Sequence, residues 1–98
     1  MEAKAPKKRG VVARTVTIVN KRGLHARAAA RFVKFAARFG ADISVVKDGT
    51  EVSGLSIMGL MMLAAGPGTE LEIRAQGPDA EEAVEALDAL VANRFDEE

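Results

Sequence analysis

Alternation between apolar and polar residues, repeated in several short segments, constrains the fold of this chain more than any other feature. The clearest case is 70–75, Glu-Leu-Glu-Ile-Arg-Ala, in which every second residue is apolar. Similar alternation among β-branched residues predicts strands at 14–20 and 41–47. A strand of this kind has one apolar and one polar face, as in an antiparallel sheet that is covered on one side only.

Helical segments separate these strands. The segment 26–39 carries three phenylalanines at spacings of three and four, which predicts a helix with an aromatic, buried face: Phe32, Phe35 and Phe39. Gly40 follows where a C′ residue would end the helix. A short apolar helix is predicted at 56–63, before the chain breaks at Gly66-Pro67-Gly68.

A hairpin and a final helix complete the predicted order. Asp48-Gly49 is a strong turn signal and leads into a short strand at 51–53. Asp79 and Glu82 have the spacing of a capping box at the start of the last helix. The predicted buried stripe of that helix consists of Val84, Leu87, Leu90, Val91 and Phe95. We therefore predict an α+β fold, an open-faced two-layer sandwich of order β-α-β-β-α-β-α with a four-stranded antiparallel sheet and three helices on one face.

Composition limits the classes of function. The 98 residues suffice for one small domain, which we expect at 14–95, with a flexible basic lead at 1–13 and an acidic tail at 96–98. Fourteen basic residues balance fourteen acidic ones, and there is one histidine and no cysteine. We expect no metal site, no cofactor and no membrane insertion, and a cytoplasmic location. A frayed, solvated tail is the simplest interpretation of the basic lead.

The single histidine lies between a predicted strand and a predicted helix. His25 would therefore be aimed at the helix N-terminus, where free backbone N–H groups and the helix dipole favour negative charge. Arg27 adds a fixed cation whose donors suit phosphate oxygens. A neutral imidazole is a competent nucleophile, so the pattern indicates phosphoryl chemistry. A surface or capping histidine without a role is the alternative.

Two short motifs in the chain resemble those of a known protein family. The run Gly-Leu-His-Ala-Arg at 23–27 resembles the active-site motif of the HPr family, the histidine-containing phosphocarriers of bacterial phosphotransferase systems. The run Ser-Ile-Met-Gly-Leu-Met at 56–61 resembles the second signature of that family. The two motifs have the order and approximate separation of the family, and the resemblance covers roughly 14–95.

The resemblance implies a carrier in a relay and no free-standing enzyme. His25 would accept phosphate at Nδ1 from enzyme I and pass it to an enzyme II A-type domain. Arg27 would stabilise the phosphoryl group, and the amides of Ala26 and Arg27 would bind it. Ser56 matches a serine that HPr kinase/phosphorylase modifies in some bacteria; its structural interpretation is a helix N-cap, and the two are compatible.

The short apolar helix and the basic row are the predicted docking surfaces. The helix carries more apolar residues than one small helix can bury, so some should stay exposed while Leu60 and Leu63 join the core. In the family, residues that match Ile57, Met58 and Met61 contribute to docking. The basic row of Arg27, Arg31, Lys34 and Arg38 would steer an acidic partner, with a merely solvated face as the alternative.

One departure from the family is visible. Ala28 stands where its commonest motif has proline, which would leave the start of the helix less constrained. This residue and the Met61-Met62-Leu63 run suggest a proteobacterial member, including the nitrogen-related branch, although the sugar and nitrogen branches both remain open.

The sequence leaves two other classes of function to consider, a binding module and a nucleic-acid binder. A small regulatory binding module of the same fold would leave His25 dispensable and never phosphorylated. A nucleic-acid binder would use the N-terminal lysines, but the zero net charge and the absence of Tyr and Trp argue against it. A free-standing enzyme is disfavoured because no second acid–base residue completes a site.

Overall fold

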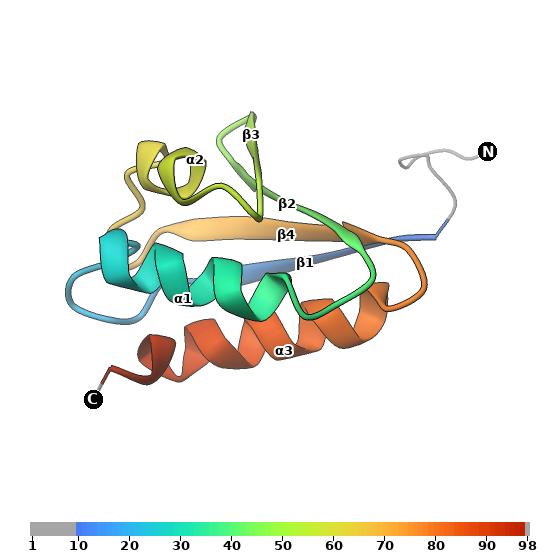
Figure 1. Cartoon of the computed structure of the whole chain (residues 1–98). Coiled ribbons are helices and arrows are strands. Elements are labelled where there is room, and N and C mark those ends of the chain that lie inside the picture. The colour runs from blue at the N-terminus through green and yellow to red at the C-terminus, as the bar shows by residue number, and fades with distance from the viewer. Residues whose placement is uncertain (1–9, 98) are drawn as a thin grey trace.

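The computed structural model describes residues 10–97. Most of the predicted basic lead, residues 1–9, and the last residue of the predicted acidic tail lie outside this range. The elements follow the predicted order, with one short turn added at the end (Figure 1). They are β1 (Val11–Thr17), α1 (Ala26–Ala36), β2 (Asp42–Lys47), β3 (Thr50–Ser53), α2 (Ile57–Met62), β4 (Glu70–Gln76), α3 (Ala80–Ala92) and the turn η1 (Arg94–Asp96).

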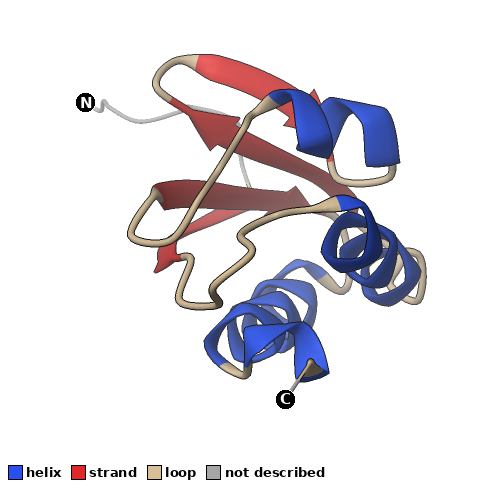
Figure 2. Ribbon diagram, turned by 90° about the vertical axis from the view of Figure 1, so that its left-hand side faces the viewer, coloured by secondary structure: helices blue, strands red, loops and turns tan. Residues whose placement is uncertain are grey.

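The four strands form one antiparallel sheet of order β1-β4-β2-β3. All helices lie on one side of it, so the other side of the sheet is open (Figure 2). The hairpin between β2 and β3 turns at Asp48 and Gly49, whose φ angles of 50° and 84° match the turn that this dipeptide predicts. The predicted two-layer α+β sandwich is confirmed.

The core lies between the sheet and the helices, where the alternation predicts it. In β4, Leu71, Ile73 and Ala75 are buried while the residues between them are partly exposed. Phe32 of α1 is buried in this core. The predicted apolar stripe of the last helix is also buried throughout: Val84, Leu87, Leu90, Val91 and Phe95. Within residues 10–97, no helix combines the length and apolar character needed to cross a bilayer.

Two predicted element boundaries are wrong. The first strand was predicted at 14–20 but occupies Val11–Thr17, so 11–13 belong to the sheet and not to the lead. Pairing decides this, because Val11 lies opposite Gln76 at the end of β4. The first helix was predicted to reach residue 39 but ends at Ala36. Tighter backbone turns follow it, and Phe39 is only partly buried.

The predicted helix stop at Gly40 and the predicted capping bond of Asp79 are also wrong. The C-cap of α1 is Ala37, and Gly40 lies beyond it without a positive φ angle. Asp79 is the N-cap residue of α3, but its side chain makes no capping hydrogen bond. Its carboxylate instead accepts a 2.7 Å hydrogen bond from the Gly40 backbone N–H. A tertiary contact between two loops has replaced both local signals.

Candidate functional site

A tightly fixed loop delivers His25 to the start of α1. Gly23 has a φ of 67°, and a Cβ there would lie 2.5 Å from the carbonyl oxygen of Ala65. The next residue, Leu24, is buried and donates its backbone N–H to the same oxygen at 2.9 Å. Only glycine fits this close approach, so the first residue of the motif serves to position the histidine.

His25 is the N-cap residue of α1, with an extended backbone. Its carbonyl oxygen accepts the first helical hydrogen bond, from Ala29 N–H at 2.8 Å. The three preceding amides, of residues 26–28, therefore have no partner within the helix. The His25 side chain makes no capping bond, and the first turn holds no acidic residue. The helix start has the free donors and uncompensated dipole of an anion site.

The predicted basic row is exposed along α1. Arg27 lies on the first turn beside the free amides, and within residues 10–97 no carboxylate pairs with its guanidinium. Arg31 is 3.9 Å from the carboxylate of Asp96, and the guanidinium of Arg38 stacks over Phe35 at 4.7 Å. Arg27 is thus the member of the row that is both adjacent to the free amides and uncommitted to an acid.

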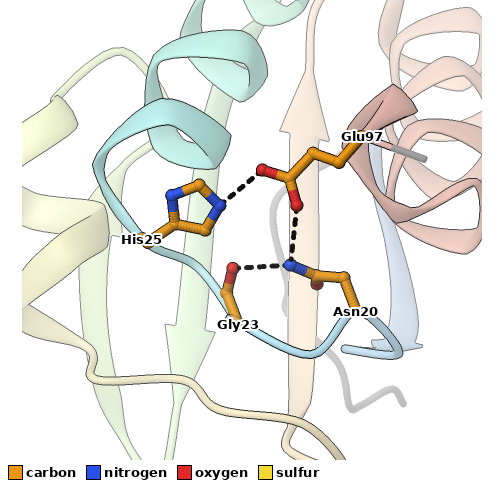
Figure 3. Close-up of polar contacts among 4 residues, drawn as sticks. All are labelled: Asn20, Gly23, His25 and Glu97. Atoms are coloured by element: carbon orange, nitrogen blue, oxygen red, sulfur yellow. Dashed lines mark hydrogen bonds and ion pairs between the residues drawn. The ribbon is translucent and has the colours of Figure 1, made fainter.

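The imidazole is held from its far side by a residue that the sequence analysis did not single out. His25 Nε2 lies 2.5 Å from Oε2 of Glu97, and both side chains are less than one-fifth exposed. The ring thereby turns its other nitrogen away from Glu97 (Figure 3). The two residues are 72 positions apart. Glu97 falls in the predicted acidic tail, and no local pattern in the sequence links it to the histidine.

Glu97 is itself held by a buried amide. Asn20, which is 1% exposed, donates its Nδ2 to the Gly23 carbonyl at 2.9 Å and to Glu97 Oε1 at 3.4 Å (Figure 3). One side chain therefore ties the loop before α1 to the end of the chain. The sequence did not indicate this contact, because Asn20 was predicted only to end a strand and begin the loop that follows it.

The second motif forms α2, which lies beside the first half of α1 (Figures 1 and 2). Ser56 is the N-cap residue, and its Oγ accepts a 2.9 Å hydrogen bond from Gly59 N–H, so the predicted structural role is confirmed. Leu60 and Leu63 are buried as predicted. The exposed apolar side chains of this region are Leu55, Ile57, Met58, Met61 and Met62.

Comparison with known proteins shows the family to which this chain belongs. Residues 12–93 match the family model described as PTS-HPr, PTS HPr component phosphorylation site. The chain belongs to the HPr family.

The phosphocarrier protein HPr of Cupriavidus necator is 49% identical over 84 residues, which cover 86% of this chain and 94% of that protein. HPr of Pseudomonas aeruginosa is 51% identical over 83 residues, covering 84% of this chain and 92% of the relative. The fold matches the crystal structure of HPr from Bacillus anthracis with a TM-score of 0.80 at 52% identity, over 83% of this chain and 96% of that one.

Membership gives the coarse function and removes some alternatives. HPr relatives are phosphocarrier proteins, so this chain is assigned a phosphocarrier role in a phosphotransferase system. A nucleic-acid binder is no longer needed to account for the sequence. Ala28, where the commonest family motif has proline, is fully buried in the first turn of α1. Its N–H lies among the three that lack a helical partner, so a proline at this position would remove no helical hydrogen bond.

Proposed function

We propose that His25 accepts a phosphoryl group from phosphorylated enzyme I and passes it to an enzyme II A-type domain. The acceptor atom is Nδ1. The chain acts as a carrier in the cytoplasm and needs its partners for catalysis. The single observation that carries this proposal is the open start of α1, where free amides surround a histidine whose other nitrogen already contacts Glu97.

Phosphoryl transfer to His25 requires a free electron pair on the ring and groups that bind the negatively charged phosphoryl oxygens. The lone pair of Nδ1 attacks the phosphorus, the N–P bond of the donor phosphohistidine breaks, and the donor ring keeps that electron pair. Charge on the transferred oxygens is then stabilised by the amides of Ala26 and Arg27 and by the Arg27 guanidinium. Positioning and charge stabilisation supply most of the catalysis of such transfers.

Docking would use the two exposed surfaces that flank the histidine. Ile57, Met58 and Met61 offer apolar area, with Met58 72% exposed. Methionine side chains repack readily, which suits a carrier that must bind both a donor and an acceptor. Arg31 and Lys34 extend the positive charge along α1 and would attract an acidic partner surface.

Ser56 is our proposed regulatory phosphorylation site. Ser56 is partly exposed at the start of α2 and immediately precedes the apolar docking residues. A phosphate there would be compatible with the helix dipole, and it would put two charges beside Ile57 and Met58. We therefore expect phosphorylation by an HPr kinase/phosphorylase to weaken docking without unfolding the protein.

The deciding experiment follows the intact mass of the protein after mixing with phosphoenolpyruvate, magnesium and enzyme I. We expect a gain of one phosphoryl group that is lost in acid and is absent from His25→Ala. An A-type domain added afterwards should remove it. Normal phosphate uptake by His25→Ala would overturn the proposal.

A regulatory binding module without phosphotransfer is the competing function. It predicts no mass gain with enzyme I from the same organism, under conditions in which that enzyme charges another HPr. For Ser56, the test is incubation with ATP and the kinase, with Ser56→Ala as the control. Phosphate uptake by Ser56→Ala would assign the modification to another residue.

A further inference from the structure

We propose that Glu97 is a positioning residue for phosphoryl transfer, which holds the His25 ring in the tautomer with the proton on Nε2. This inference rests on the proposed function, because it specifies how that site presents its nucleophilic atom. A neutral imidazole carries one N–H and one lone pair, on different nitrogens. A carboxylate placed at Nε2 accepts the N–H there and leaves the lone pair on Nδ1.

The geometry supports this assignment from both sides of the carboxylate. Oε2 lies 2.5 Å from Nε2 of His25, within hydrogen-bond reach, while Oε1 is 3.4 Å from the amide nitrogen of Asn20 (Figure 3). An amide NH₂ can only donate, so Oε1 is an acceptor, and an ionised carboxylate has no proton of its own to give to Nε2 from Oε2. Asn20 is buried and also bonded to Gly23, which fixes the carboxylate relative to the loop that carries the ring.

The backbone before Glu97 turns so that this residue lies beside the histidine. Three consecutive residues that are not glycine, Arg94, Phe95 and Asp96, have φ angles of 57°, 55° and 61°. Each left-handed residue of this kind is unfavourable, so a run of three needs compensation. The Phe95 side chain provides it, because it is among the largest fully buried side chains of the described residues. Phe95 thus anchors this segment in the core and places Glu97 at the Nε2 edge of the ring.

The neighbouring carboxylate does not compete for this role. Asp96 lies 3.9 Å from the guanidinium of Arg31 and accepts a hydrogen bond from the side chain of Asn93. It is therefore directed to the basic row and to its own turn. The two adjacent acids make a matched pair, of which one contacts the imidazole and the other does not.

The transfer step is consistent with a stationary proton. When the Nδ1 lone pair forms the N–P bond, the ring becomes a phospho-imidazolium and the proton stays on Nε2 in its bond to Glu97. The positive charge of the ring then faces the carboxylate. When the N–P bond breaks toward the acceptor, the ring takes back the electron pair on Nδ1 with its proton still in place. No proton has to move in either direction.

The test measures the tautomer directly, without any phosphate donor. Nitrogen-15 shifts of the two ring nitrogens of His25 would be recorded at about pH 8, where an ordinary imidazole is neutral. We expect the Nε2–H form to dominate in the unaltered protein. In Glu97→Ala, the ratio of the two forms should fall by about tenfold, since a charge-assisted hydrogen bond is lost. Asp96→Ala should leave it unchanged.

Kinetics and a conservative variant complete the test. Phosphorylation by enzyme I should slow by about tenfold in Glu97→Ala, by analogy with removing the partner that orients a metal-ligating histidine. Glu97→Gln keeps an acceptor oxygen and should recover most of the tautomer ratio. Thermal melting of each variant checks that the anchor at Phe95 is intact.

The possible failures are distinguishable. An Nε2–H ratio in Glu97→Ala equal to that of Asp96→Ala would overturn the role of Glu97, even where His25 is phosphorylated normally. A shifted ratio in a protein that never accepts phosphate would instead overturn the proposed function and leave the contact with Glu97 as an orienting one.

Discussion

The starts of α1 and α2 form a pair in which the same structural position is used in opposite ways. At α2, Ser56 turns its hydroxyl inward and accepts the N–H of Gly59, so the helix start is closed by its own side chain. At α1, His25 occupies the N-cap position but points to Glu97, and the amides of its first turn stay free. One helix start has been stabilised, and the other has been left able to bind an anion. In this pair, the helix start without a side-chain cap is the one at which we propose phosphate binding.

Among the variants that test this difference between the two helix starts, Gly23→Ala should have the largest effect on stability. The new Cβ would approach the Ala65 carbonyl oxygen at a position with φ of 67°, so we expect a loss of about 2–4 kcal/mol in the free energy of unfolding. Gly49→Ala is the matched control: its φ is 84°, but nothing lies within 4 Å of the added Cβ. That variant should lose about 1 kcal/mol. Equal losses in urea titrations would show that contact with Ala65 does not fix the loop.

Next in size is the reversal of charge beside the open amides. Arg27→Glu should slow phosphorylation by enzyme I at least about tenfold, which corresponds to about 1.4 kcal/mol in the barrier. Arg38→Glu makes the same charge change just beyond the C-cap of α1, at the end of the helix opposite His25, and should have a several-fold smaller effect. Stopped transfer in both variants would mean that net charge, and not a local phosphate contact, controls the rate.

A smaller effect is expected when the closed helix start is opened. Ser56→Ala removes the acceptor for Gly59 N–H and should destabilise the fold by about 1 kcal/mol. Ser56→Asp restores an acceptor and should recover most of that loss in thermal melting. A Ser56→Ala protein as stable as the parent would remove the contrast between the two helices.

The smallest effect is expected from closing the open start. His25→Ser should be more stable than His25→Ala by about 0.5–1 kcal/mol, because a serine can cap amides that the histidine leaves free. Neither variant should accept phosphate. Identical unfolding free energies for the two would indicate that the first turn of α1 has no free donor to satisfy.

The fold keeps the local patterns that predicted its strands and its hairpin turn. Alternation in 70–75 predicted which side chains of β4 are buried, and the Asp48-Gly49 turn was predicted from two residues alone. Both features depend on contacts between near neighbours in the chain or on the period of a strand. The position of His25 at the start of α1 was predictable for the same reason, since it depends only on a loop and the helix that follows it.

The features that differ from the sequence-based predictions depend on contacts between residues far apart in the chain. Gly40 bonds with Asp79 instead of ending its helix, and the early start of β1 follows from pairing with β4. Glu97 reaches His25 only because three residues adopt a left-handed backbone that none of them favours. The assignment of this chain to the nitrogen-related or the sugar branch stays a prediction.

The sheet register has a consequence for how the protein assembles during synthesis. Val11 pairs with Gln76, so the first strand of the sheet has no partner until most of the chain has been made. Contacts so distant in sequence are slow to form. The contact of His25 with Glu97 comes later still, near the end of the described chain. A nascent chain therefore exposes its histidine motif early and gains an oriented ring last, which couples the readiness of the carrier to the completion of its fold.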